Sequence, residues 1–399
     1  MSPTERLYFE DSFLLRFTAR VVAHGAWQGA PSLVLDRTAF YPEAGGQMAD
    51  RGVLGGQALA DVQVDDAGVV HHVLAPGAAL PAVGEALEGA VDWARRRAHM
   101  SLHTGQHMLS RALEDVAGAH TVSSRLGETL CTIDVDLEAL PEAQVQEAEA
   151  RVNAVIDQDV PIRAFFPTPE ELSRLPLRRA PKVSENIRVL QIGDFDVSPC
   201  GGTHCTRSGQ VGLVRVLGVE RNKGRARVLF DAGPRARAGL WSEVGVLRGL
   251  ARDFTCGPLE VPAAVDKLRR ELTDAREALG LVRARLAEAA AAELLQQLQA
   301  SPERRCVGVL DGGAELLRAV AARLGSQERA VVLLAGRTPE GLAVLVARGP
   351  GSDFACGAFL KRAAEAAGGR GGGRPEAAEG RLPAGTDWPA LVSRLLGAS

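Results

Sequence analysis

The sequence predicts an α+β protein built from several domains, and changes of pattern along the chain indicate where they lie. Residues 1–90 hold short β-rich runs, and residues 91–238 mix helical and strand patterns. Residues 239–300 have a helical pattern throughout, and residues 301–399 alternate strands with helices. Because 399 residues are too many for one ordinary core, we expect each of these four segments to be a domain or a connector.

The first segment is predicted to be an N-terminal small β-barrel, with a sandwich as the alternative. Its β-rich runs are separated by glycine- and proline-containing turn signals at strand-like spacing. The runs are LLRFTARVVAH, PSLVLDRTAFY, VQVDD and GVVHHVLA.

The second segment opens with a long helical pattern. The stretch DWARRRAHMSLHTGQHMLSRALEDVAG, which starts at Asp92, has helical spacing and ends in glycine. A second helix is predicted after Pro141, with the strand TLCTIDVDL between the two helices. Further strands are predicted in IRVLQIGDFDVS, VGLVRVLGVER and RARVLFDAG, which makes this segment an α+β domain.

The third segment has the hydrophobic spacing of a coiled coil. Apolar residues alternate at spacings of three and four over about three and a half heptads, following Pro262 near the helix start. One long helix packed on its own domain fits the pattern equally well, because the seam is short. The seam positions are Val265, Leu268, Leu272, Ala275, Leu279, Val282, Leu286 and Ala289.

The last segment is predicted to be α/β. CVGVL, AVVLLAG and LAVLVAR have the composition of buried strands, and AELLRAVAARLG has helical spacing. The glycine-rich stretch GGRGGGRPEAAEG follows one predicted helix and precedes another. Composition alone favours a linker there, but its position fits a turn built into a domain.

Composition limits the classes of function. Hydrophobic residues make up 46% of the chain and charged residues 24%, with a net charge of −3, so an anionic partner has to meet a local basic patch. We find neither a signal peptide nor an apolar run long enough to span a membrane, and we expect a cytoplasmic protein. Six scattered cysteines suggest free thiols or metal ligands rather than a disulfide framework.

Two short motifs carry the residue types of a metal site. His103 and His107 lie four residues apart on the predicted helix, so their imidazoles share one face, which His99 extends by one turn. Alone this pair is a weak signal. Cys200 and His204 repeat the spacing on a loop bent by two glycines, and together the four side chains form a tetrahedral set suited to one zinc ion per chain. A buried helix face and an unrelated turn are the alternative, and the pattern does not separate catalytic from structural zinc.

These motifs resemble those of a known family. HTGQHMLSRAL followed by DVSPCGGTHC resembles the HTxxH and CGGTH motifs of the editing domain of alanyl-tRNA synthetases and of the AlaX-type alanyl-tRNA editing proteins. LDRTAFYPEAGGQMADRG resembles the family's TxFYPxGGGQxxDxG signature, and GGRGGGRPEAAEG resembles the glycine-rich loop of the DHH-associated domain. The combination is specific and covers nearly the whole chain, in the layout of the long AlaX form.

The resemblance gives each predicted segment an identity. It implies an N-terminal β-barrel subdomain at 1–90 and a zinc-binding α+β tRNA editing domain at 91–238. It further implies a helical, coiled-coil-like connector at 239–300 and a C-terminal α/β DHH-associated domain at 301–399. Since the aminoacylation domain of the synthetases has no counterpart in the chain, we expect no tRNA charging.

The resemblance also implies a reaction. The chain would be a hydrolase that deacylates mischarged tRNA(Ala), chiefly seryl-tRNA(Ala), with glycyl-tRNA(Ala) as a second substrate. His103, His107, Cys200 and His204 would bind the zinc ion. Thr38 and Gln47 match polar pocket positions and are the candidate catalytic residues; without the resemblance we would interpret them as a strand and a turn residue. A non-catalytic tRNA-binding module with a structural zinc is the alternative function.

The expected partner is the acceptor end of tRNA(Ala), together with a second copy of the chain. The homodimer would form through the helical connector and the C-terminal domain. Local basic groups are the candidate tRNA contacts, although such clusters are usually solvated faces. The candidates are Arg178, Arg179, Lys182, Arg221, Lys223, Arg370 and Arg374.

Two departures from the family pattern stand out. Ala44 occupies the position of the first glycine in GGGQ, and Cys205 stands where the family usually has an apolar residue. We expect the backbone at Ala44 to tolerate a Cβ atom. Cys205 is interpreted as a small buried hydrophobe, with a rival metal ligand as the alternative.

Overall fold

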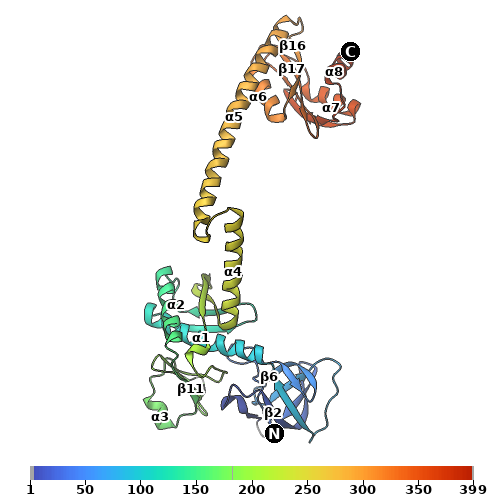
Figure 1. The fold of residues 1–399 in the computed structure, drawn as a ribbon. Helices are drawn as coiled ribbons and strands as arrows, with labels where there is room; N and C mark the ends of the chain where they lie inside the picture. Colours follow the sequence, from blue (N-terminus) through green and yellow to red (C-terminus); the bar gives the residue numbers. More distant parts are fainter. Residues whose placement is uncertain (1–3, 182, 398–399) are drawn as a thin grey trace. The chain divides into compact units, whose positions relative to one another are not determined.

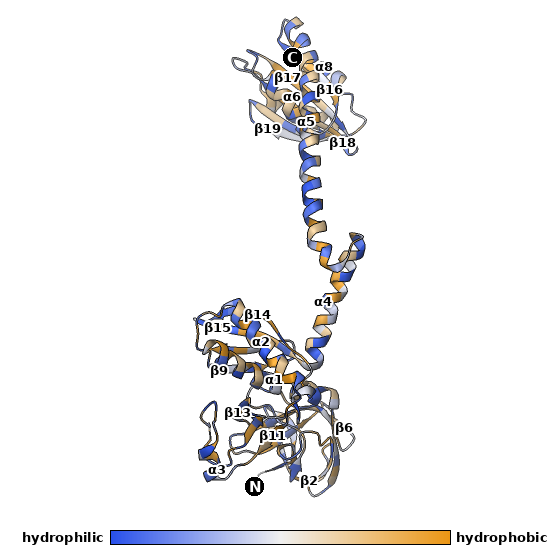
Figure 2. Cartoon of the chain, turned by 60° about the vertical axis from the view of Figure 1, so that its left-hand side comes forward, coloured by the Kyte–Doolittle hydropathy of each residue, from blue (hydrophilic) through white to orange (hydrophobic). Residues whose placement is uncertain are grey.

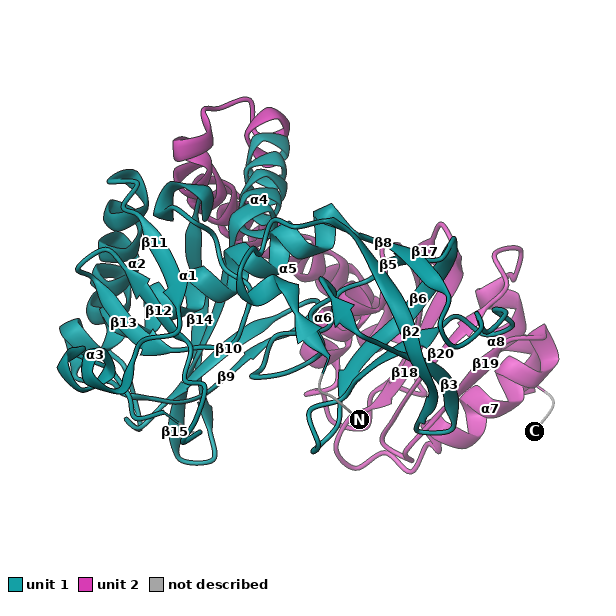
Figure 3. Ribbon diagram, turned by 90° about the horizontal axis from the view of Figure 1, so that it is seen from below, with its two compact units in different colours: residues 1–249 teal, residues 250–399 magenta. Residues whose placement is uncertain are grey.

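The computed structural model describes residues 4–181 and 183–397, which fold into two compact units. The first unit covers residues 1–249 and the second 250–399, and each is described by itself (Figure 3). Both units mix helices with sheets, which confirms the predicted α+β class (Figure 1). The finer domain boundaries expected near residues 90, 238 and 300 stay predictions.

The first unit begins with six strands that close into a ring. Antiparallel pairing joins them in the order β2-β3-β7-β6-β5-β8, and β2 pairs with β8 to complete the ring. Alternate residues of β2 point inward because side chains of a strand face its two sides in turn. The strands are β2 (Arg16–Trp27), β3 (Ala30–Leu35), β5 (Gly52–Leu54), β6 (Gln57–Val64), β7 (Val70–Leu74) and β8 (Ala86–Val91), with β1 (Glu5–Arg6), η1 (Leu7–Phe9) and β4 (Arg37–Thr38) beside them.

A long helix, α1 (Trp93–Ala117), follows the ring and is buried over most of its length. The Asp92 side chain caps its start by accepting a hydrogen bond from the amide of Arg95, and Gly118 ends it in a left-handed conformation at φ 64°. The predicted helix therefore forms with the boundaries that its end signals indicate.

Two antiparallel sheets surround α1. The first has the order β14-β15-β10-β9 and the second the order β11-β12-β13. Helix α2 (Glu142–Asp157) packs against α1 and β14. The strands are β9 (Thr121–Leu126), β10 (Cys131–Val135), β11 (Ile162–Phe165), β12 (Val189–Ile192), β13 (Asp196–Pro199), β14 (Val214–Asn222) and β15 (Arg225–Ala232), and α3 (Pro169–Arg174) and η2 (Ser208–Gln210) lie in the connections.

The second unit is a five-stranded sheet with helices. Its strand order is β16-β17-β18-β20-β19, and β16 and β17 are the parallel pair. The glycine-rich stretch, for which we expected a turn, instead contains edge strand β19 (Arg370–Gly373). The other elements are α5 (Val261–Ala300), β16 (Arg305–Asp311), α6 (Ala314–Leu324), β17 (Val331–Thr338), β18 (Gly341–Arg348), α7 (Cys356–Ala367), β20 (Ala377–Leu382) and α8 (Trp388–Gly397), while α4 (Gly233–Asp253) crosses the boundary of the units and η3 (Pro258–Glu260) precedes α5.

Helix α5 has two parts that differ in packing. Its last part packs on α6 and β16, through Ala287, Ala291, Leu294 and Leu298. The preceding part is exposed and mostly hydrophilic in Figure 2, and its seam leucines are about half exposed. The single-helix alternative therefore describes the last part, while the coiled coil stays a prediction for the exposed part. Among the described residues, no helix is both long and apolar enough to cross a membrane.

Candidate metal centre

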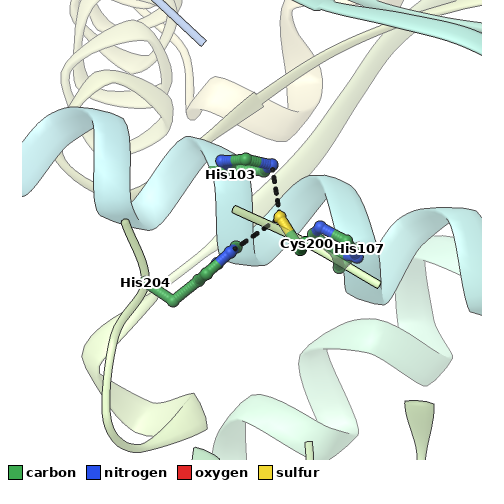
Figure 4. A group of neighbouring side chains, drawn as sticks. All are labelled: His103, His107, Cys200 and His204. Carbon is green, nitrogen blue, oxygen red and sulfur yellow. Dashed lines mark hydrogen bonds between the residues drawn. The ribbon is translucent and has the colours of Figure 1, made fainter. Parts of the chain in front are cut away.

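Four side chains from two distant stretches of sequence meet in the first unit. His103 and His107 lie one turn apart on α1, and Cys200 and His204 lie on the loop that follows β13 (Figure 4). One nitrogen or sulfur atom from each lies within 4.8 Å of the others. The Sγ atom of Cys200 is 3.4 Å from Nε2 of His103 and 3.2 Å from Nε2 of His204. The two predicted half-sites therefore come together.

Gln47 orients the first histidine. Its Oε1 atom lies 2.7 Å from Nδ1 of His103, so this nitrogen donates and Nε2 is left free to face Cys200. The same oxygen accepts from the amide of Thr203 at 3.2 Å, and Gln47 Nε2 donates to the Thr203 hydroxyl at 2.9 Å. Gln47 thus joins the first half of the sequence to the CGGTH loop and positions a ligand.

A buried chain of groups orients the second histidine. Nδ1 of His107 lies 2.9 Å from the Ser198 hydroxyl, which donates to Asp196 at 2.9 Å. Arg178 donates to the other oxygen of Asp196 at 2.7 Å, and its side chain is buried. The guanidinium of Arg178 is thus used inside the protein, and its predicted contact with tRNA stays a prediction.

The third histidine is held by the helix itself. Nδ1 of His204 lies 3.3 Å from the hydroxyl of Thr104, which also accepts a hydrogen bond from the amide of Cys205. The Cys205 side chain is buried outside the group of four, and burial raises the pKa of its thiol. This arrangement matches the interpretation of Cys205 as a small buried hydrophobe. His99 is likewise buried but outside the group.

The donor set fits a metal ion. Nε2 of His107 is fully buried and has no hydrogen-bond partner among the described residues, which an ion would supply. Burial opposes ionisation of Cys200, but the imidazoles of His103, His204 and His107 hold the pKa of its thiol well below its usual range. Burial lowers the pKa of His204 to about 3, which keeps a lone pair available. A donor set of three imidazoles and one thiolate suits zinc.

A cleft of about 1050 Å³ opens beside this centre, entirely within the first unit. His103, Cys200 and Gly202 line it, together with the turn at Gly45 and Gly46. A buried polar group on one side of a cleft is the usual arrangement of a binding site, so the centre is accessible to a small substrate.

Thr38 does not belong to this cleft. Its side chain is fully buried, and its hydroxyl lies 2.8 Å from Nε2 of His72 and accepts from the amide of Phe40 at 3.1 Å. It is absent from the residues that line the cleft. In this geometry Thr38 links β4 to His72 on β7, and its expected contact with substrate stays a prediction.

The remaining basic candidates of the first unit lie at different places. Arg179 lines the cleft, whereas Arg221 on β14 forms an exposed ion pair with Glu138. Lys223 occupies the turn between β14 and β15, in a left-handed conformation at φ 50°. Lys182 lies outside the described residues.

The two candidates of the second unit flank the glycine-rich strand. Arg370 begins β19, and Arg374 follows its end; both are exposed. Arg370 also lines a hollow of about 910 Å³ with the neighbouring glycines.

Two positions beside the centre were missed from the sequence, Gln106 and Arg188. Gln106 lies between the two histidine ligands, lines the cleft and donates to the Ser110 hydroxyl at 2.7 Å. Arg188 is buried and donates to the carbonyls of Cys200 and Gly202, which fixes the ligand loop. The position of Gln106 inside the HTGQH motif could have identified it from the sequence. No local sequence pattern pointed to the role of Arg188.

Family models match three parts of the chain. The second additional domain of threonyl and alanyl tRNA synthetases matches residues 187–228, which hold the Cys200–His204 loop. The class II (A) tRNA synthetase model matches residues 15–95, and the DHHA1 domain matches residues 307–397. The region that holds Cys200 and His204 and the C-terminal region thus both resemble domains related to tRNA synthetases.

Whole proteins resemble the chain as well. Alanine–tRNA ligase of Thermococcus kodakarensis is 34% identical over 393 residues, which are 95% of this chain and 42% of that protein. The alanyl-tRNA editing protein AlaX-L of Pyrococcus horikoshii is 35% identical over 239 residues, which are 58% of this chain and 59% of that protein. The chain therefore spans less than two thirds of either relative.

Among solved structures, the C-Ala domain of Aquifex aeolicus alanyl-tRNA synthetase matches with 25% identity and a TM-score of 0.22. The match covers 23% of this chain and 86% of that one. The sequence relationships rest on the three family models and on the two relatives. The chain is therefore related to the alanyl-tRNA synthetases and to the alanyl-tRNA editing protein AlaX-L, and it carries synthetase-related domains.

Proposed function

We propose that the chain hydrolyses the ester that joins a wrong amino acid to tRNA(Ala), chiefly in seryl-tRNA(Ala) and secondly in glycyl-tRNA(Ala). The observation that carries the proposal is the cluster of His103, His107, Cys200 and His204 beside an open cleft. An editing relative, AlaX-L, supports it. The work would take place in the cytoplasm, where tRNA is charged.

In the proposed reaction, water attacks the ester carbonyl, the carbon–oxygen bond to the ribose breaks, and the ribose oxygen takes up a proton. One zinc ion, held by the four side chains, would supply Lewis-acid polarisation when bound. Gln47 and Ser198 keep the imidazoles of His103 and His107 in the required orientation.

The chain also offers groups for the amino acid. Gln106 lines the cleft next to His103, and Thr121, which donates to the same Ser110 hydroxyl, lines it too. These polar groups can pair with the serine hydroxyl. Correctly charged alanyl-tRNA lacks that hydroxyl and would leave them unpaired, which disfavours it.

The second candidate function is a tRNA-binding module whose metal is structural. It is favoured by the set of four protein ligands, since structural zinc sites are closed by four and catalytic sites usually keep a position open. Under either function the proposed partner is the acceptor end of tRNA(Ala). Arg179, Arg221, Lys223, Arg370 and Arg374 remain proposed contacts with that RNA.

Release of serine from seryl-tRNA(Ala) tests the proposal, with zinc content measured in the same samples. His103→Ala and Cys200→Ala should each lose zinc and lower the rate by more than about 100-fold, because each removes a ligand. Cys205→Ala is the matched control and should keep both, since Cys205 lies outside the group. A chain that binds zinc and tRNA but releases no serine is the structural module instead.

A further inference from the structure

The cleft beside the metal centre is larger than an amino acid ester requires. Its volume of about 1050 Å³ is at the upper end of pockets that hold a drug-sized ligand. Only His103, Cys200 and their near neighbours adjoin the centre, so most of the lining has to contact another part of the substrate. That remaining lining contains an aromatic ring, Phe166, and several arginine side chains.

An exposed aromatic ring stands in this lining. Phe166, just beyond the end of β11, is 49% exposed, although large aromatic side chains are normally buried. The ring of Phe9 supports it edge-on at 5.7 Å and 71°. The guanidinium groups of Arg6 and Arg188 lie over the Phe9 ring, at 5.6 and 5.2 Å from its centre. Phe166 is therefore the ring of this pair that is left open to a ligand.

The charges around the pair favour an anion. Among the described residues that line the cleft, Arg6, Arg179 and Arg188 carry positive charge and Glu185 is the one carboxylate. None of the three arginines forms an ion pair within the described part of the chain. Their guanidinium groups donate hydrogen bonds to backbone carbonyls. The charges of Arg6 and Arg179 thus remain available to phosphate groups, whereas Arg188 is buried and holds the loop of Cys200 and Gly202.

We propose that Phe166 is the stacking surface for the terminal base of the tRNA 3′ end, which the proposed function brings to this cleft. An exposed ring among uncompensated guanidinium groups is the combination with which proteins bind single-stranded nucleic acid. The base lies on the open face of Phe166, and Arg6 and Arg179 meet the adjoining phosphates. Phe166 positions the ester and takes no part in the chemical step.

A short RNA hairpin with the tRNA acceptor end and 2-aminopurine in place of its terminal adenine tests this assignment, because stacking quenches the fluorescence of 2-aminopurine. The full chain should quench it. Phe166→Leu should abolish the quenching and raise Kd about 5- to 150-fold, the equivalent of the 1–3 kcal/mol typical for one stacked base. Phe166→Trp should retain both.

Trp241→Leu is the matched control, because Trp241 on α4 is 65% exposed but lies outside the cleft. It should quench and bind as the unmodified chain does. Unchanged quenching in Phe166→Leu, or lost binding in Phe166→Trp with an unchanged melting temperature, overturns the assignment. Because the probe carries no ester, this experiment tests binding independently of deacylation. If quenching depends on Phe166 but the chain releases no serine, the stacking assignment stands and only the proposed hydrolase is refuted.

Discussion

At the scale of the residue, His72 makes folding of the first unit depend on pH. Its imidazole is fully buried on β7, where it accepts from Thr38 and donates to the carbonyl of Leu33. Burial lowers the pKa of His72 from 6.5 to about 4. The unfolded chain therefore binds an additional proton between these values, and the free energy of unfolding falls as the pH drops from 6.5 toward 4.

The loss attributable to His72 is at most about 3 kcal/mol, from 1.36 kcal/mol for each unit of pKa. Urea unfolding between pH 7 and 4 measures it. His72→Gln keeps an amide that can accept and donate hydrogen bonds. It should reduce the slope of the unfolding free energy against pH by the equivalent of up to one bound proton. His24→Gln, on the exposed side of β2, is the control and should leave it in place. Equal slopes for His72→Gln and the unmodified chain would refute this account.

Roles of single residues depended on contacts that one sequence does not reveal. The meeting of His103, His107, Cys200 and His204 could be predicted, because each pair has a spacing that suits a metal within a short motif. Gln47 was assigned to substrate, but its oxygen binds His103, which is 56 residues away. Arg178 had the composition of a solvated basic cluster, yet a buried carboxylate, Asp196, pairs with it. Such long-range partners decide function and leave no local pattern.

At the scale of the element, the loop after β13 requires glycine at one position and merely tolerates it at the next. A Cβ atom on Gly202 would lie 2.2 Å from Cε1 of His103, which is far inside contact distance. A Cβ atom on Gly201 would meet nothing closer than the Phe9 ring at 3.8 Å. The loop can therefore approach α1 closely only because Gly202 lacks a side chain.

Gly202→Ala should displace His103 and weaken zinc binding about 10- to 100-fold, the loss typical when the orientation of a ligand is disturbed. Gly201→Ala is its neighbour and control and should bind zinc as the unmodified chain does. A chelator competition with both variants measures the affinities. Equal zinc affinities of Gly202→Ala and Gly201→Ala would show that the close contact of Gly202 with His103 is not needed to position this histidine.

Elements with strong local signals were predictable, and those shaped by their surroundings were not. Helix α1 carries a polar cap, a periodic apolar face and a terminal glycine, so its sequence specifies it. Strand β9 has little alternation of buried residues, because one part of it lines the cleft. Strand β19 consists of glycines and one arginine, and its pairing with β20 creates the strand against local preference.

At the scale of the whole molecule, the exposed part of α5 leaves an apolar stripe uncovered. Leu268, Leu272, Leu279, Val282 and Leu286 are all about half exposed or more, and with Ala275 they recur at alternating spacings of four and three. A helix of this kind gains stability by packing the stripe against a partner. Identical copies present the same seam, so two chains can pair along it as a coiled coil. We propose this homodimer.

Sedimentation of the full chain tests the homodimer with paired leucine substitutions. Leu272→Glu, on the seam, should convert dimers to monomers at micromolar concentration, because it places a charge in the paired apolar seam. Leu281→Glu is the matched control: Leu281 is 67% exposed on the same helix but lies off the seam, so the dimer should persist. An unmodified chain that sediments as a monomer would exclude pairing through α5, and dissociation by Leu281→Glu alone would place the interface on another face of the helix.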